Sequence, residues 1–230
     1  MRSSLATAVT AKVPAAVIMR GAANLPQRKV DPVRQLGTTH VLARGEELFA
    51  EGDACEFFYK VVSGTVRTYK LLSDGRRQID AFHLAGDLFG LEASGEHRFS
   101  AEAVDGATVL AFGRNRLDAL THENPVFGDL VMSSMIRNLE RAQDHMLLLG
   151  RKTAQEKIAT FLLDLADRMT KDDHFELPMQ RTDIADHLGL TIETVSRTLT
   201  QFARAGMIKL AASSRSVILA DRPALETLNA

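Results

Sequence analysis

Four side chains toward the C-terminal end of the chain have the chemistry needed to distinguish base pairs. Arg197 can donate two hydrogen bonds to guanine N7 and O6, and Glu193 can accept one from cytosine N4. Ser196 can adapt as donor or acceptor, and Ile192 offers an apolar contact to a thymine methyl group. The alternative is that Glu193 and Arg197, which stand four positions apart, only form an exposed ion pair on a helix.

The segments around these side chains have the arrangement of a helix-turn-helix. Ala185 is small where two helices would cross closely, Gly189 supplies a tight turn, and Thr191 can cap a second helix over residues 191–205. The apolar positions that would lock the two helices together are Ile184, Leu188, Leu190 and Val195. We therefore expect the second helix to face the major groove of double-stranded DNA. Its candidate contacts are Thr191, Ile192, Glu193, Thr194, Ser196 and Arg197.

After the second helix, residues 207–210 and 216–219 predict the two strands of a small hairpin, or wing. Basic residues exceed acidic ones by two between Pro178 and Ser216, with Arg181, Arg197, Arg204, Lys209 and Arg215 against Asp183, Asp186 and Glu193. This excess is modest, so salt-dependent, non-specific binding to DNA should be moderate.

A long helix is predicted before this motif. Asn124 can cap it, Pro125 suits its first turn and Gly150 is the nearest stop, which gives about 26 residues or about 40 Å. Its apolar residues follow the spacing of a coiled-coil seam: Val131, Met135, Leu139, Ala142, Met146 and Leu149. A single helix lying on a β domain could show the same stripe, but this helix is longer than a small domain can cover. The pattern favours a homodimer, with a further helix from Thr153 to about Met169.

Residues 38–115 show the rhythm of short strands. Apolar or alternating runs such as 57–62, 65–69 and 108–112 are separated by glycines at intervals of about ten residues. The segment Ser73–Gly75 is a strong hairpin signal between two such runs. This spacing predicts a small barrel or jelly roll.

No set of residues suited to catalysis or metal binding stands out in the sequence. The seven histidines are dispersed and each is expected to be a surface residue or a hydrogen-bonded polar residue; they stand at positions 40, 83, 97, 122, 145, 174 and 187. The motifs of serine hydrolases, zinc proteases and phosphate-binding loops are missing. Cys55 is expected to be a packing residue near a turn, with a redox role as the alternative. We therefore expect no catalytic residue, no metal ligand, no cofactor and no enzyme activity.

The composition is typical of a globular protein without a membrane segment. Of the 230 residues, 45% are hydrophobic and 25% charged, and 28 Lys and Arg against 29 Asp and Glu give a net charge of −1. The longest apolar runs, such as 146–149, are far shorter than the ~18 residues that span a bilayer. A single cysteine excludes an internal disulfide and a cysteine-rich metal site, so a cytoplasmic location is expected.

The chain divides into four expected parts. Residues 1–34 should form a mobile tail; residues 1–30 hold five basic residues and no acidic one, so a transit peptide is the alternative. A β-roll is expected over 35–122, a dimerisation helix over 123–150 and a winged helix-turn-helix over 151–230. The expected fold class is α+β, with an N-terminal, jelly-roll-like β-roll, a long helix and a C-terminal winged helix-turn-helix.

This layout resembles the CRP/FNR family of bacterial transcription regulators over about residues 35–225. The specific matches are His83–Leu88, Leu177–Met179 and Gly189–Arg197. The E-T-V-S-R form at 193–197 is similar to the FNR and FixK branch of the family rather than to the CRP branch.

The resemblance also implies what such a regulator binds. The expected target is a palindrome of TTGAT half-sites, centred about one helical turn apart to match the two-fold axis of a dimer. Glu193, Ser196 and Arg197 would make the base contacts, and RNA polymerase would be a partner of an activator.

Two departures from the family decide the subgroup. FNR members hold an iron–sulfur cluster through several cysteines, mostly near the N-terminus, whereas Cys55 alone cannot supply four thiolates. Cyclic-AMP binders carry a G-E-L turn and then an Arg-Ser or Arg-Thr pair, but here Gly90 is followed by Leu91–Glu92 and Arg98 by Phe99–Ser100. Arg98 is therefore expected to be a surface residue. What remains resembles FixK, an activator of low-oxygen or nitrogen-fixation genes that works without cluster or effector.

Two other functions stay open at this point. The chain could bind DNA in the same way but be gated by a small effector or cofactor in the β-roll. It could also be an enzyme or ligand-binding module of the roll type, which would show no sequence preference on DNA.

Overall fold

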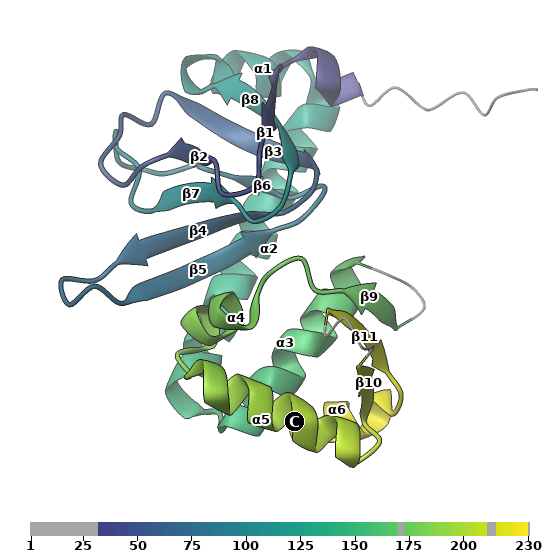
Figure 1. The fold of residues 1–230 in the computed structure, drawn as a ribbon. Coiled ribbons are helices and arrows are strands. Elements are labelled where there is room, and N and C mark those ends of the chain that lie inside the picture. The colour runs from purple at the N-terminus through teal and green to yellow at the C-terminus, as the bar shows by residue number, and fades with distance from the viewer. Residues whose placement is uncertain (1–31, 170–172, 211–214, 230) are drawn as a thin grey trace, which may run out of the picture. The chain divides into compact units, whose positions relative to one another are not determined.

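The computed structural model describes residues 32–169, 173–210 and 215–229. Most of the predicted tail, residues 1–31, lies outside the described residues, and a short 3-10 helix, η1 (Pro32–Gln35), opens the described part. Across these residues, no helix is both long and apolar enough to cross a membrane. Helices and antiparallel sheets occur together, so the predicted α+β fold class is confirmed (Figure 1).

The N-terminal domain is built from two antiparallel sheets of four strands each. The first has the order β1 (Thr38–Leu42), β8 (Ala107–Gly113), β3 (Phe57–Ser63) and β6 (Leu88–Phe89). The second has the order β2 (Glu47–Phe49), β7 (Ser100–Ala103), β4 (Val66–Leu71) and β5 (Arg77–His83). Strands β4 and β5 form the hairpin predicted around Ser73–Gly75, and Gly75 takes a positive φ of 84° there.

The two sheets pack face to face around one core. Between the sheets, the Tyr59 ring stacks on those of Phe49 and Phe89 with ring centroids 5.5 Å apart, and the Phe49 and Phe89 rings are tilted at 6.3 Å. Val61 and Val66, one from each sheet, are fully buried in the same cluster. This arrangement is the predicted β-roll.

One glycine is required where two turns of the roll meet. Gly64 has a φ of 76°, a left-handed conformation that favours glycine. A Cβ atom at this position would clash with the carbonyl oxygen of Gly106 and the Cα of Ala107. The rhythm of glycines in the sequence therefore has a steric cause at this crossing.

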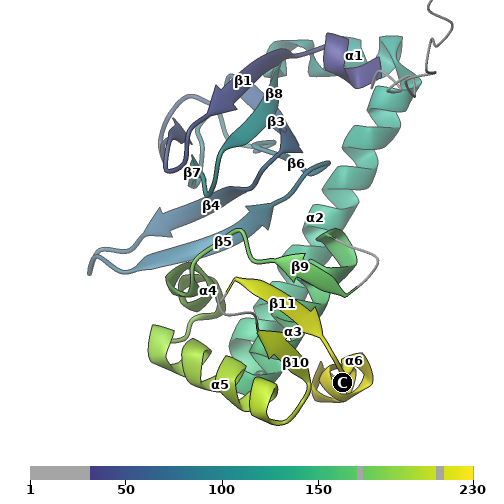
Figure 2. The ribbon, with the colours of Figure 1, turned by 45° about the vertical axis from the view of Figure 1, so that its right-hand side comes forward.

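The long helix begins where the sequence predicts. After a short helix, α1 (Leu117–Glu123), the helix α2 spans Pro125–Arg151 and ends one residue beyond Gly150. The Asn124 side chain accepts a hydrogen bond from the backbone N–H of Phe127 at 3.1 Å. Figure 2 shows α2 running from α1, beside the roll, to the next helix, α3 (Ala154–Met169).

The first turns of α2 pack on the outer face of the β-roll. Phe127 is fully buried, and its ring lies 5.2 Å from that of Phe112 and 6.3 Å from that of Phe58. Val131 is 6% exposed in the same cluster. The chain itself therefore covers one side of the amino-terminal half of α2.

The predicted seam of α2 is exposed only in part. Met135, Leu139 and Met146 are 51%, 60% and 66% exposed, and Ala142 is exposed too. Val131 and Leu149 depart from the expected open stripe, because they pack inside the chain at its two ends. The exposed large apolar residues of α2 are Val126, Met132, Met135, Ile136, Leu139, Met146 and Leu147.

The C-terminal part holds two further helices and a three-stranded sheet. The helices of the predicted motif are α4 (Arg181–Leu188) and α5 (Ile192–Arg204). The predicted wing strands are β10 (Ile208–Leu210) and β11 (Ser216–Leu219). A third strand, β9 (His174–Glu176), pairs with β11, and the helix α6 (Arg222–Asn229) packs on α3; neither was predicted from the sequence.

A single apolar core joins the C-terminal part to the roll. Ile79 and Phe82 of β5 are buried in one cluster with Leu162 of α3, Leu188 of α4 and Leu199 of α5. A polar link lies beside this core. Asp87 accepts hydrogen bonds from Arg141 of α2 at 3.0 Å and from Arg168 of α3 at 2.7 Å.

Candidate nucleic-acid interface

The first helix of the pair, α4, has both ends closed by local interactions. Gln180 and Asp183 form a capping box, in which the Asp183 carboxylate accepts a hydrogen bond from the Gln180 backbone N–H at 3.0 Å. Gly189 ends the helix in the left-handed conformation, with φ 62° and ψ 43°. The backbone N–H of Leu190 then donates to the Ala185 carbonyl at 3.0 Å, which completes the tight turn.

The second helix, α5, starts immediately after this turn. The Thr191 hydroxyl accepts a hydrogen bond from the backbone N–H of Thr194 at 3.2 Å, so Thr191 is the N-cap that the sequence predicts. Its inward face carries four buried side chains, of which the last three stand three, four and seven positions after the first, as expected for one face of a helix: Val195, Thr198, Leu199 and Phe202. Val195 packs in one core with Ile184 and Leu188 of α4, and the pair of helices is held as one unit.

The opposite face of α5 presents the side chains predicted to read bases. Ile192 is 40% exposed, Glu193 and Arg197 are exposed, and Thr194 and Ser196 are half-buried. Within the described part of the chain, Arg197 has no salt-bridge partner, so the alternative Glu193–Arg197 ion pair is not formed. The Arg197 guanidinium keeps its donors free for a ligand.

The position of Glu193 in the first turn of α5 stabilises the charged form of its carboxyl group. Its carboxylate accepts hydrogen bonds from its own backbone N–H and from the Thr191 hydroxyl, which keep the pKa of Glu193 below its ordinary value. At neutral pH the exposed face of α5 therefore offers a carboxylate acceptor one helical turn from a guanidinium donor. This is the combination that distinguishes cytosine from guanine.

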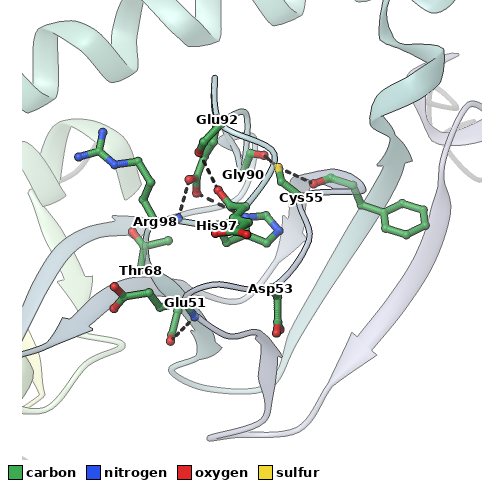
Figure 3. A network of polar contacts seen from close by, with 12 residues as sticks. Glu51, Asp53, Cys55, Thr68, Gly90, Glu92, His97 and Arg98 are labelled. Atoms are coloured by element: carbon green, nitrogen blue, oxygen red, sulfur yellow. Dashed lines mark hydrogen bonds and ion pairs between the residues drawn. The ribbon is translucent and has the colours of Figure 1, made fainter.

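The segment Gly90–Arg98, where the sequence lacks the pattern of cyclic-AMP binders, is held by its own polar contacts (Figure 3). The Glu92 carboxylate accepts a hydrogen bond from the backbone N–H of Arg98 at 2.6 Å and lies 3.4 Å from His97 Nδ1. The His97 ring stacks on Phe49 at 3.6 Å. The Arg98 side chain is exposed, as expected.

Cys55 lies in the same region and is 5% exposed. Its thiol donates to the Gly90 carbonyl at 3.3 Å (Figure 3). Its sulfur accepts from Arg114 Nη1 at 3.0 Å. These contacts bring together three segments of the roll, in agreement with the expected packing role.

Two of the histidines are buried rather than on the surface, and buried residues of this type are expected to be hydrogen-bonded. His83 and His97 are 8% and 3% exposed. The His83 ring is hydrogen-bonded to Thr68 at 3.1 Å, and burial lowers the pKa of His83 to about 4. His145 Nε2 is an exception to the expectation, since it is buried without a hydrogen-bond partner among the described residues. The described residues contain no group of three or more side chains that could hold a metal ion.

The sequence reasoning missed a cluster of charges where the roll meets α4. Arg67 of β4 and Arg77 of β5 both contact Oδ1 of Asp183, at 2.8 and 2.6 Å. Arg77 also contacts Asp186, at 2.8 Å. No local signal could have revealed these pairs, because their members stand more than a hundred positions apart in the chain.

Comparison with known families assigns both halves of the chain. The family described as "Cyclic nucleotide-binding domain" matches residues 39–124. The family described as "Crp-like helix-turn-helix domain" matches residues 156–228.

Individual relatives match over most of their length. The "Nitrogen fixation regulation protein FixK" of Azorhizobium caulinodans is 49% identical over 213 residues, 90% of this chain and 86% of the relative. The "Fumarate and nitrate reduction regulatory protein" of Escherichia coli is 36% identical over 193 residues, 81% of this chain and 76% of the relative. The solved structure of FixK2 from Bradyrhizobium japonicum superimposes with a TM-score of 0.79 at 44% identity, covering 84% of this chain and 98% of that chain.

The β-roll, the long helix and the winged helix-turn-helix together define a DNA-binding transcription regulator, and the relatives are regulators rather than enzymes. The chain belongs to the CRP/FNR family of transcription regulators. The resemblance noted in the sequence, including its similarity to FixK, is thereby confirmed.

Proposed function

We propose that this protein is a homodimeric, sequence-specific activator that binds a palindrome of TTGAT half-sites without a bound effector. The observation that carries the proposal is the exposed face of α5, where Arg197 has no salt-bridge partner among the described residues. Relatives that carry the name "Nitrogen fixation regulation protein FixK" support a role in nitrogen-fixation or other low-oxygen genes. An activator also needs RNA polymerase as its partner.

In the proposed complex, the N-terminal half of α5 enters the major groove. Arg197 donates two hydrogen bonds to a guanine, Glu193 accepts one from a cytosine, and Ile192 contacts a thymine methyl group. Ser196 supplies an adaptable hydrogen bond. Thr191 and Thr194, at the amino end of the helix, lie where phosphate contacts position such helices.

The dimer is proposed to form along the exposed apolar side of α2. Met135, Leu139 and Met146 lie four and seven residues apart and are each more than half exposed. A parallel second copy of α2 would cover them and place two α5 helices about a two-fold axis, which a palindrome requires. We propose the division expected from the sequence for this dimer, with a roll over 35–122, a dimerisation helix over 123–150 and a DNA-binding domain over 151–230.

Binding without an effector is supported by the charge of the roll. The Glu92 carboxylate accepts a hydrogen bond from the backbone N–H of Arg98 at 2.6 Å, so this donor is not open to an anionic ligand. A phosphate at this position would also be repelled by Glu92. The match to cyclic nucleotide-binding domains over 39–124 favours the second candidate, in which the same DNA-binding role is gated by a small effector in the roll.

Fluorescence anisotropy on a labelled duplex tests the proposal. Protein purified in air should bind the TTGAT palindrome tightly, and bind a scrambled duplex of equal length at least about a thousandfold more weakly, which is the lower end of the specificity ratios that such regulators reach. Specific binding that requires an added small molecule or the removal of oxygen would replace this function by the gated one. Equal binding to both duplexes would exclude sequence-specific recognition.

A further inference from the structure

Helix α4 is attached to the hairpin of β4 and β5 by apolar packing. Ile79 of β5 is fully buried against the core that includes Leu188 of α4. Phe82 of the same strand lies edge-on to the His187 ring, with centroids 5.2 Å apart. Apolar packing has no preferred direction, so it brings the two elements together without setting their register.

Ion pairs with defined geometry lie beside this packing. Asp183 is held between Arg67 Nη1 at 2.8 Å and Arg77 Nη2 at 2.6 Å, and its side chain is 7% exposed. Asp186, one helical turn further, accepts from Arg77 Nε at 2.9 Å. On its other side, Arg67 is held within the roll by Glu102 at 2.6 Å. Charge-assisted hydrogen bonds of this kind fix direction as well as distance.

Two further hydrogen bonds lie next to the ion pairs, each between a side chain of one element and a backbone carbonyl of the other. Gln78 Nε2 donates to the His187 carbonyl at 3.2 Å. His187 Nδ1 lies 3.1 Å from the Ile79 carbonyl, and burial lowers the pKa of His187 to about 3. The ring is therefore neutral at physiological pH and can donate the Nδ1 proton to this carbonyl.

The orientation of α4 determines the orientation of α5. The two helices share one core and are joined by a turn of only three residues, Gly189, Leu190 and Thr191. A contact that fixes α4 on the roll therefore also fixes the base-reading face of α5.

We propose that Arg67 and Arg77 are positioning residues for DNA binding. Their ion pairs with Asp183 and Asp186 hold the helix pair on the roll in the orientation that binds DNA. In this protein the ion pairs would stabilise the DNA-binding orientation without a small-molecule ligand. The inference rests on the proposed effector-free binding of DNA. Without the ion pairs, the helix pair samples other orientations, and the apparent affinity falls in proportion to the fraction that is still competent.

The pair of Arg77 and Asp186 provides the test, because Asp183 also caps α4 and its replacement would damage the helix itself. We compare Arg77→Gln, Asp186→Asn and the double variant by anisotropy on the TTGAT palindrome. Arg77→Gln loses the ion pairs to both Asp183 and Asp186 and should raise the Kd about tenfold, whereas Asp186→Asn loses only one of them and should raise it less. The double variant should be little worse than Arg77→Gln alone, since Asp186 then has no further pair to lose. Arg76→Gln is the matched control, because Arg76 pairs with Asp74 within the exposed tip of the hairpin and should leave the Kd unchanged.

A specificity measurement separates positioning from base contact. The ratio of Kd values between the palindrome and its single-base variants should stay at the wild-type value in Arg77→Gln, Asp186→Asn and the double variant. A changed ratio would mean that Arg77 or Asp186 acts on the bases, and would overturn the positioning role.

A distance measurement separates positioning from a loss of stability. Spin labels at His40→Cys in the roll and Thr200→Cys on α5, in a Cys55→Ala background, should give a narrow distance distribution in the parent and a broad one in the double variant. A distribution that stays narrow, together with unchanged DNA affinity, would overturn the proposal while leaving DNA binding intact. Failure of the parent protein to prefer the palindrome would instead overturn the proposed function.

Discussion

At the scale of single residues, function depends on which charged groups are satisfied inside the protein and which are left for a ligand. Arg67 and Arg77 are both engaged by carboxylates at 2.6 to 2.9 Å. Arg197 has no such partner among the described residues, and its guanidinium stands on the exposed face of α5. The same residue type therefore has a structural role at the first two positions and is available for recognition at the third.

Replacing Arg197 by alanine should abolish sequence-specific binding. Loss of a bidentate contact to guanine costs about 1–3 kcal/mol in each half-site, so a dimer would lose about 2–6 kcal/mol of discrimination. Anisotropy with the palindrome and the scrambled duplex measures this loss. Arg204→Ala, at the carboxyl end of α5, is the control and should weaken both complexes slightly and equally. Unchanged specificity in Arg197→Ala would show that the bases are read by other residues.

Two buried histidines should make the protein less stable in mild acid. The pKa values of His83 and His187 are lowered to about 4 and about 3 by burial, whereas an unfolded histidine titrates near 6.5. Between these values the unfolded chain binds more protons than the folded one, so stability is complete above about pH 6.5 and falls as the pH drops.

Urea unfolding at about pH 7.5 and about pH 5.5 measures this effect. The free energy of unfolding should fall by about 1 kcal/mol for each of the two histidines. His83→Asn should reduce the pH-dependent part of the loss, while His40→Asn, at an exposed position, should not. An equal loss in both variants would contradict the assignment to His83.

At the scale of elements, one side of α2 packs inside the chain and the other side is exposed. One side is covered by the chain itself, through Phe127 and Val131 against the roll and Leu148 in the core that joins the C-terminal part to the roll. The other side leaves Met135 and Leu139 exposed. An apolar stripe of this length on a helix is typical of a protein–protein interface.

A charge placed on this stripe should separate the proposed dimer. Leu139→Glu would bury a carboxylate without a partner, which costs several kcal/mol, and sedimentation equilibrium should then show monomers. DNA binding should weaken in parallel, because one half-site is then bound at a time. Leu139→Met changes shape but not polarity and should remain dimeric. A dimeric Leu139→Glu would place the interface elsewhere.

At the scale of the whole described molecule, one apolar core connects the roll with the DNA-binding helices. Phe82 of β5 contacts Phe161 of α3 and the His187 ring of α4. Phe49 lies in the separate core between the two sheets of the roll. A substitution at Phe82 should therefore destabilise the packing of both domains, whereas a substitution at Phe49 should destabilise only the roll.

Phe82→Ala should lower the free energy of unfolding by about 3–5 kcal/mol. Amide hydrogen exchange should become faster in α4 as well as in β5, because the two elements lose a shared contact. Phe49→Ala is the matched control and should speed exchange in the roll while α4 stays protected. If exchange in α4 is unchanged by Phe82→Ala, the two domains are not coupled through this core.

Much of the site follows from interactions between residues close in sequence. The cap at Thr191, the turn at Gly189 and the start of α2 at Asn124 each depend on a few neighbouring residues, and the structure has them as predicted. The short strand β9 was missed because its three residues carry only one buried side chain, Phe175, and form a strand by pairing with β11. A pairing partner that distant leaves no local pattern.

The sequence by itself determined the class of the protein, because helix periodicity, caps and the spacing of Ile192, Glu193, Ser196 and Arg197 are local properties of the chain. Only the tertiary structure decided which part of the α2 stripe is open, since the neighbours of Val131 and Leu149 come from other elements. It also decided that Arg67 meets Asp183, 116 positions away. Contacts of that kind depend on how whole elements pack, and packing is not encoded in the spacing of any single segment.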